Sequence, residues 1–331
     1  MKRYLLALLF FALQVSHSIA QNYIRQCENI KITKWLNGAN SAFTFTFDDS
    51  NYAHQKVAEI LDQYGFRGTF LASPGKLDWN KLAPMYKKMT ENGHEVGSHT
   101  WNHKRLPITS KDSLSLEIVD PIDYIKEKVG VYPVSFVHPF NSTNKYIDSL
   151  VFSNYLFSRI SSPYSLKDRF IKGIYSETSL EDINKWIEKT QNEQKWLIVT
   201  GHGLNGVGWS PVTSDLLNVI CKLLKTFDKA IWVATLSKIA AYEYLKNEIS
   251  IQTVEKKNRI EINIIGFQKQ KYEKMNKMPV TIEVPLNEDF KVFVDNNDNN
   301  IDLNYNDVEK LYMLTFDLKE VNNITLRVEK K

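Results

Sequence analysis

The chain has 331 residues, and 42 lysines and arginines against 38 aspartates and glutamates give a formal net charge of +4. This nearly neutral balance provides no argument for a nucleic-acid-binding protein. The length suits one large α/β domain together with a small additional one.

The first twenty residues have the pattern of an export signal. Lys2 and Arg3 precede an apolar run over 4–15, and Ser18–Ala20 forms a small-x-small cleavage site. The run is shorter than the ~20 residues that a membrane-spanning helix needs. We therefore expect cleavage near Ala20, no membrane span, and a soluble mature protein in the periplasm or outside the cell. Loss of Lys2 and Arg3 lowers the formal charge from +4 to +2.

The next part of the chain predicts alternating strands and helices. Residues 42–47 alternate phenylalanine with threonine or alanine, which is typical of a strand. Apolar periodicity and glycine stops then predict strands at 68–72, 94–97, 135–138, 156–160, 171–174, 196–200 and 230–234, and helices at 53–64, 82–92, 114–129, 145–153, 212–226 and 236–246. This alternation predicts a parallel sheet or barrel.

Side chains that bind metals or transfer protons come directly after several of these strands. They are Asp48, Asp49, His99, His138 and His202. Function in a closed parallel barrel collects at the carboxyl ends of the strands, so one rim would gather all five.

The segment His99-Thr-Trp-Asn-His103 places two imidazoles four positions apart, so one helical turn would point both in the same direction. A carboxylate from residues 48–49 would complete three protein ligands with an open position, the arrangement of catalytic zinc sites. The other carboxylate would then be a base beside the metal, which indicates hydrolysis. A non-haem iron oxygenase uses the same ligand types, but it usually has a β-rich barrel.

After about residue 247 the pattern changes to short alternating runs separated by Asn, Asp, Gly and Lys. Strands are expected at 249–254, 259–265, 280–284, 290–294, 311–318 and 324–328. We therefore expect three parts, namely a signal peptide over 1–20, an α/β domain over 21–247 and a small β-sandwich-like domain over 248–331.

Three motifs resemble the polysaccharide deacetylases of the NodB-homology type, carbohydrate esterase family 4, and the resemblance covers roughly residues 43–244. The motifs are Thr46-Phe-Asp48-Asp49, His99-Thr-Trp-Asn-His103 and the late strand that ends in His202. The resemblance implies an α/β fold, specifically a distorted (β/α) barrel of the NodB type with a metal at the carboxyl-end rim. The chain would be a divergent member with a small C-terminal all-β domain.

The resemblance also implies a role for each matching residue. Asp48 would be the general base and His202 the general acid, while Asp49, His99 and His103 would bind a divalent metal. Zinc suits this ligand set best, and cobalt, nickel or iron also fit it. The implied reaction is metal-dependent removal of acetyl groups, N-acetyl ahead of O-acetyl, from a carbohydrate or polysaccharide.

Three motifs depart from the family pattern, and one of them is the fifth, where Thr200 stands in place of the leucine usual two positions before the histidine. The third motif usually carries an arginine that orients the base, and here His138 stands before Pro139-Phe140 instead. The Asp-Trp of the fourth motif has no counterpart. These departures leave one alternative open, a catalytically impaired carbohydrate-binding protein on a deacetylase scaffold. His138 would either supply the missing polar contact or be a buried structural histidine.

Three side chains are expected to contact the substrate. Trp209 lies in a glycine-rich loop, and tryptophan faces stack on sugar rings. Phe140 lies in a loop that could offer a backbone N–H to the oxyanion, and His138 precedes it. Trp101, between the two metal histidines, is expected to pack in the barrel wall.

The chain has two cysteines, Cys27 and Cys221. They could pair in an oxidising compartment, but the sequence does not place them within the ~5.5 Å Cα separation that a disulfide prefers. Two separate buried thiols are the alternative.

Overall fold

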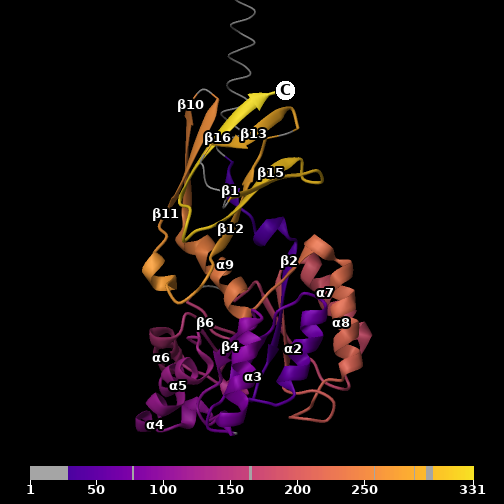
Figure 1. The fold of residues 1–331 in the computed structure, drawn as a ribbon, viewed down its shortest axis with the longest axis vertical. Coiled ribbons are helices and arrows are strands. Elements are labelled where there is room, and N and C mark those ends of the chain that lie inside the picture. Colours follow the sequence, from indigo (N-terminus) through magenta and orange to yellow (C-terminus); the bar gives the residue numbers. More distant parts are fainter. Residues whose placement is uncertain (1–28, 77, 164–165, 257, 287, 296–300) are drawn as a thin grey trace, which may run out of the picture. The chain divides into compact units, whose positions relative to one another are not determined.

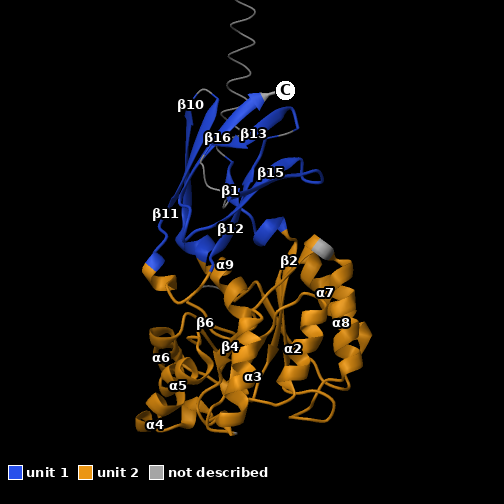
Figure 2. Ribbon diagram, in the orientation of Figure 1, with its two compact units in different colours: residues 1–38, 245–269, 277–331 blue, residues 39–244, 270–276 orange. Residues whose placement is uncertain are grey.

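The structure is a computed structural model that describes residues 29–331 apart from 77, 164–165, 257, 287 and 296–300. It contains two compact units (Figure 2). The α/β unit comprises Ala39–Tyr244 and Gln270–Asn276, and the β unit comprises Leu245–Lys269, Lys277–Lys331 and the described part of Met1–Gly38. The expected signal peptide and Cys27 lie outside the described residues.

A parallel sheet forms the centre of the α/β unit (Figure 1). Its strands follow the order β6-β5-β4-β3-β2-β8-β7, and β9 pairs with the start of β2. The strands are β2 (Ser41–Phe47), β3 (Thr69–Ala72), β4 (Glu95–Ser98), β5 (Ser135–Phe136), β6 (Phe157–Ser158), β7 (Arg169–Gly173), β8 (Trp196–Gly201) and β9 (Ile231–Val233). The predicted α/β fold, a distorted barrel of the NodB type, is confirmed.

Helices connect the strands of this sheet and pack around it (Figure 1). They are α2 (His54–Gln63), α3 (Trp79–Glu91), α4 (Lys111–Ile118), α5 (Asp120–Val129), α6 (Lys145–Asn154), α7 (Leu180–Asn192), α8 (Ser214–Thr226) and α9 (Leu236–Glu248). The single helix predicted at 114–129 is wrong, because the chain breaks between α4 and α5. Pro121 lies at the start of α5, where its missing N–H and fixed φ suit a helix beginning.

The central strand β2 is buried on both faces, which its alternating sequence does not suggest. The threonine face is tolerated because its hydroxyls are satisfied. Thr44 Oγ1 donates to the Ala234 carbonyl at 3.0 Å, and Thr46 Oγ1 donates to the Val199 carbonyl at 2.9 Å. The strand is therefore fixed by hydrogen bonds on one face and by phenylalanine packing on the other.

The β unit consists of two four-stranded antiparallel sheets, with the orders β1-β12-β15-β14 and β10-β11-β16-β13. Its strands are β1 (Lys31–Ile32), β10 (Ser250–Lys256), β11 (Arg259–Ile265), β12 (Pro279–Val284), β13 (Phe290–Val294), β14 (Ile301–Asn306), β15 (Leu311–Asp317) and β16 (Asn323–Lys330). The all-β C-terminal part is confirmed. Strands β1 and β14 were not predicted, and pairing of β1 with β12 places residues 29–38 in this unit.

Within the part of the chain that the structure describes, no helix combines the length and apolarity needed to cross a membrane. The remaining cysteine, Cys221, is buried in α8, and burial raises the pKa of its thiol to about 12.

Candidate active site

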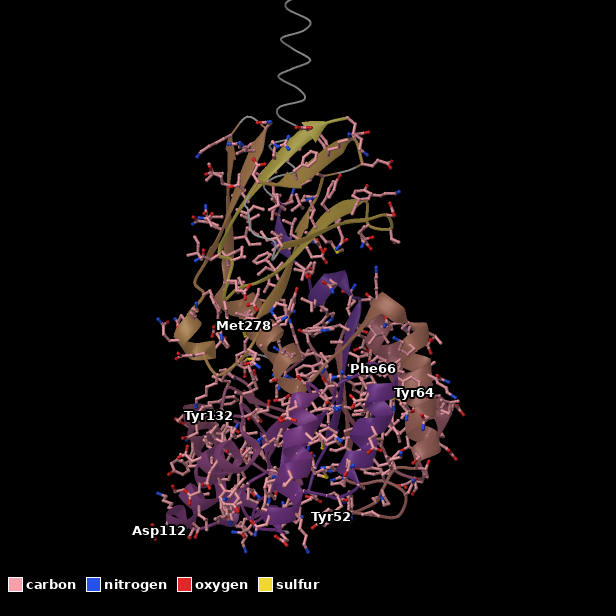
Figure 3. All side chains as sticks on the ribbon, viewed as in Figure 1. Tyr52, Tyr64, Phe66, Asp112, Tyr132 and Met278 are labelled. Carbon is pink, nitrogen blue, oxygen red and sulfur yellow. The ribbon has the colours of Figure 1, made fainter. Side chains whose placement is uncertain are left out.

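The candidate site residues lie where parallel strands of the sheet end. Asp48 follows β2, His99 follows β4 and His202 follows β8. Backbone hydrogen bonds join these ends, from Asp48 N to the Gly201 carbonyl at 2.9 Å and from His99 N to the Ala72 carbonyl at 2.7 Å. Tyr52, four residues after Asp48, lies at the lower end of the α/β unit in Figure 3.

Three potential metal ligands meet at this rim. One ligand atom each from Asp49, His99 and His103 lies within 4.8 Å of the others. Asp49 Oδ1 is 3.1 Å from His103 Nε2 and 3.6 Å from His99 Nε2. Ligand atoms bound at about 2.0–2.1 Å around a tetrahedral zinc are about 3.3 Å apart, so these separations suit one small cation. Asp49 Oδ1 is buried and lies within reach of both imidazole nitrogens, as expected of a ligand atom.

The surroundings of His99 and Asp49 favour the forms of these side chains that bind a metal. His99 Nδ1 donates to the Val137 carbonyl at 2.7 Å, which leaves Nε2 with a lone pair toward Asp49. Burial lowers the pKa of His99 to about 4, so this imidazole is neutral at pH 7. Burial raises the pKa of Asp49, but a hydrogen bond with His103 and the nearby charges outweigh it and hold that pKa well below its usual range. The donor set therefore fits a divalent cation.

Strained backbone coincides with this site. Asp49 (φ 80°), Thr100 (φ 65°), His103 (φ 59°) and Phe140 (φ 60°) all adopt positive φ although none is glycine. Such conformations cost of order 1–3 kcal/mol each and persist only where surrounding contacts enforce them. Two of the three candidate ligands are thus held in unfavourable backbone conformations.

Glu117 of α4 fixes the loop that carries the two histidines. Its carboxylate accepts hydrogen bonds from Asn102 N at 2.8 Å and from Asn102 Nδ2 at 2.9 Å, and its backbone carbonyl accepts from Trp101 N at 3.0 Å. Glu117 is buried. A buried carboxylate with two donors on the residue next to His103 restrains the direction of that ligand.

Arg159 supplies a guanidinium to Asp48, and the sequence analysis missed it. Nη1 lies 2.9 Å from Asp48 Oδ1 and Nη2 lies 2.8 Å from Oδ2, with both side chains almost completely buried. This bidentate pair fixes the carboxylate plane. Burial raises the pKa of Asp48, but Arg159 followed by His99 and His202 lowers it, and the resulting pKa lies below the ordinary value.

A second buried arginine fixes the segment that carries Arg159. Arg169 Nη1 donates to the Ser158 carbonyl at 2.5 Å and to the Arg159 carbonyl at 3.2 Å. Its Nη2 pairs with Glu243 Oε2 at 2.6 Å. Asp48 is therefore held by its ion pair with Arg159, whose backbone is in turn held by Arg169 and its ion pair with Glu243.

His202 lies among aromatic rings and close to the two aspartates. Its ring is 4.6 Å from the Trp209 ring, edge to face, and 6.4 Å from the Tyr175 ring, roughly parallel. Its Nδ1 is buried without a hydrogen-bond partner among the described residues, so no carboxylate orients it. Burial lowers its pKa, and the charges of Asp48 and Asp49 oppose that change.

The segment that carries His202 is itself tethered. His54, buried in α2, lies with Nε2 3.3 Å from the His202 carbonyl and with Nδ1 3.0 Å from the Tyr86 hydroxyl. Burial lowers the pKa of His54 to about 4, so it is neutral at pH 7. His54 was not among the predicted site residues.

Two of the predicted substrate contacts reach the surface. Trp209 is 62% exposed and Phe140 is 55% exposed. The Phe140 ring lies 4.8 Å from the His103 ring, so both aromatics border the site. His138 differs, because it is completely buried with Nε2 3.4 Å from Asp148 Oδ1. We therefore do not place His138 among side chains that contact substrate.

Two further side chains, Trp101 and Lys76, lie next to the candidate metal ligands. The ring of Trp101 packs 4.9 Å from Tyr124, which agrees with the expected packing role. Lys76 was not predicted, and its Nζ lies 3.3 Å from Asp49 Oδ1. This ammonium contacts the same oxygen that would bind a metal.

The comparisons with known proteins agree with the motifs. Residues 35–153 match the sequence model of the family described as polysaccharide deacetylase. A gellan lyase from a Bacillus species is 24% identical over 71% of this chain and 11% of its own. The peptidoglycan-N-acetylglucosamine deacetylase PgdA of Listeria monocytogenes is 26% identical over 33% of this chain and 23% of its own.

The chain thus spans about a tenth to a quarter of these relatives. A crystal structure from Mycobacterium smegmatis that carries a provisional polysaccharide deacetylase name superimposes with a TM-score of 0.53. It shares 16% identity and covers 66% of this chain and 94% of its own, which establishes the fold. The resemblance predicted from the motifs is confirmed, and residues 35–153 carry the match to the polysaccharide deacetylase family.

Proposed function

We propose that this protein is a metal-dependent deacetylase that removes N-acetyl groups from a carbohydrate or polysaccharide. The observation that carries the proposal is the meeting of Asp49, His99 and His103 at one point beside the Arg159-paired Asp48. The name of PgdA, which contains the substrate N-acetylglucosamine, supports an amide rather than an ester target. We expect zinc in the site.

A bound divalent cation supplies Lewis-acid chemistry, because it withdraws electrons from a carbonyl oxygen and makes water a stronger acid. Asp49, His99 and His103 would hold that cation. Asp48 would accept a proton from the attacking water, with its carboxylate plane fixed by Arg159. His202 would donate a proton to the departing amine, so the products are acetate and a free amino sugar.

The surroundings of His202 determine both the pKa and the orientation of its ring. Burial lowers the pKa of His202 and the charges of Asp48 and Asp49 only partly oppose this, so its protonated ring is a stronger acid than a free imidazolium. Its orientation comes from Trp209, Tyr175 and the backbone tether to His54, because no carboxylate contacts Nδ1 among the described residues. Trp209 and Phe140 would contact the sugar on the two sides of the reacting group.

The direct test is acetate release from neutral and acidic N-acetylated and O-acetylated oligosaccharides. The purified protein would be stripped with a chelator and reloaded with zinc, cobalt, nickel or iron. We expect release that depends on added metal and that is fastest with N-acetylated sugars. Tight sugar binding with metal present and no acetate release would instead support the impaired carbohydrate-binding alternative.

We also propose that the protein is exported after cleavage near Ala20. The basic start, the short apolar run and the small residues before Gln21 support this. Amino-terminal sequencing of protein recovered from outside the cytoplasm should begin at or near Gln21. Protein that retains Lys2 and Arg3 in the cytoplasm would contradict the proposal.

A further inference from the structure

A cleft of about 360 Å³ lies beside the loop that carries His103, and Asn102 and Glu117 line its inner side. The turn after His103 forms one side of it with Lys104 and Arg105, and α4 forms the other. Its lining includes Ile108, 81% exposed, and Leu116, 40% exposed. Asp112, at the start of α4, lies at the lower end of the α/β unit in Figure 3, the same end as Tyr52.

The cleft carries positive charge that is not neutralised. Lys104 and Arg105, which line the cleft, are exposed and form no ion pair within the described residues. The acids close by do not cancel them. Glu117 is buried and occupied by two hydrogen bonds from Asn102, and Asp112 is a single exposed acid. We call Lys104 and Arg105 the cationic ledge.

The cationic ledge is connected to the candidate active site by ring contacts. The Arg105 guanidinium carbon lies 4.5 Å above the centre of the Phe140 ring, and that ring lies 4.8 Å from the ring of His103. Phe140 therefore lies between the edge of the metal site and the guanidinium. This continuity favours one ligand that spans both places over an unrelated molecule in the cleft.

We propose that the cationic ledge binds a carboxylate of an acidic glycan whose neighbouring acetylated sugar occupies the metal site. The inference rests on the proposed function and specifies its substrate class. Arginine matches a carboxylate with two parallel hydrogen bonds, and lysine adds a point charge. The exposed apolar side chains of Ile108 and Leu116 would meet the C–H faces of the sugar.

The test uses the full mature protein loaded with zinc and three oligosaccharides of equal length. One is a neutral N-acetylglucosamine oligomer, one alternates N-acetylglucosamine with glucuronate, and one alternates it with muramic acid, whose carboxylate belongs to a lactyl ether. Acetate release gives kcat and KM for each, and calorimetry gives Kd. The two acidic oligomers distinguish a backbone uronate from a side-chain carboxylate.

The variants are Arg105→Ala, Lys104→Ala and, as a matched surface control, Lys222→Ala, which removes an exposed lysine of α8. We expect a lower KM for at least one acidic oligomer than for the neutral one. Arg105→Ala should raise that KM about 3- to 10-fold more than it raises the neutral KM, because a charge-assisted bond is lost. Lys104→Ala should act in the same direction more weakly, and Lys222→Ala should change nothing.

Salt gives a second readout, because raising ionic strength from about 0.01 M to about 0.15 M shortens the screening length from about 30 Å to about 8 Å. The advantage of the acidic oligomer should shrink accordingly. Equal effects of Arg105→Ala on neutral and acidic oligomers would overturn the proposal, as would Arg105-dependent binding of anionic lipid vesicles without binding of either acidic oligomer. If no oligomer releases acetate, the proposed function fails. The Kd values then still show whether the cationic ledge binds the carboxylate.

Discussion

Arg159 changes the interpretation of the residue that would act as base. The sequence pattern lacks the arginine expected before Pro139, which suggested a differently tuned Asp48 or a decayed site. The structure supplies the guanidinium from the end of β6 instead, in a buried bidentate pair. Asp48 thus has a guanidinium partner although the motif lacks its arginine.

The first prediction concerns Arg159→Ala. Removal of the guanidinium leaves Asp48 buried, charged and free to turn, so we expect kcat to fall about 100-fold, with a smaller change in KM. Added guanidinium ion should restore part of the rate, and this rescue separates a positioning role from general damage. Kinetics of acetate release with and without guanidinium would measure both effects.

A stability measurement provides the control for this variant. Breaking a buried ion pair costs about 3–5 kcal/mol, because one charge is left unpaired. The double variant Arg159→Ala, Asp48→Asn should therefore be more stable in denaturant than Arg159→Ala alone. An Arg159→Ala protein with full activity would show that the pair is structural only.

Most of the candidate site residues could be found from the sequence, but the residues that position them could not. Asp48, Asp49, His99, His103 and His202 carry recognisable spacing at predicted strand ends. Arg159 pairs with Asp48 across 111 positions, a contact that no local pattern encodes. The one available signal was a lone arginine near the end of a predicted apolar strand at 156–160.

At the scale of elements, the loop between β4 and α4 is restrained by contacts with α4. His103 has a positive φ, and Glu117 of α4 anchors the neighbouring Asn102. Residues that orient metal ligands typically affect metal affinity 10- to 100-fold when they are changed. Helix α4 thus contributes to the site without supplying a ligand.

The second prediction is that Glu117→Ala weakens metal binding about 10- to 100-fold. Titration of the chelator-stripped protein with zinc would measure the change in Kd. Glu117→Gln keeps one acceptor for the two Asn102 donors, so it should lose less affinity than Glu117→Ala. Unchanged zinc affinity in both variants would mean that the loop keeps its strained shape without α4.

The elements themselves were predicted unevenly, for physical reasons. Long periodic segments such as α8 and buried strands such as β8 were anticipated within about two residues. The break between α4 and α5 was missed because the apolar periodicity continues across Pro121. Strand β14 was missed because its Asp, Asn and Tyr residues look like a turn, and it forms only because β15 pairs with it.

At the scale of the whole molecule, neutral buried histidines link folding to pH. Burial lowers the pKa of His54 to about 4, whereas the unfolded chain has the ordinary value near 6.5. Between these values the unfolded state binds more protons, so stability rises with pH. The contribution is complete above about pH 6.5 and is lost progressively as the pH falls toward 4.

The third prediction follows from this linkage. In the presence of a chelator, lowering the pH from 7 to 5 should reduce the free energy of unfolding by about 2 kcal/mol through His54 alone. His54→Gln cannot titrate, so its stability should fall less over the same pH interval, even though the variant is less stable at pH 7. Denaturant unfolding of both proteins at the two pH values would measure the difference. Parallel losses in the two proteins would contradict the assignment.

The proposed reaction assigns different roles to the adjacent Asp48 and Asp49, and one paired measurement tests these roles most directly. Bound zinc and acetate release would be determined side by side for the unaltered protein, Asp48→Asn and Asp49→Ala. We predict that Asp48→Asn binds one zinc but releases almost no acetate, whereas Asp49→Ala binds little zinc and is inactive at ordinary zinc concentrations. An Asp48→Asn protein that remains fully active, or an Asp49→Ala protein that keeps its zinc, would contradict the account.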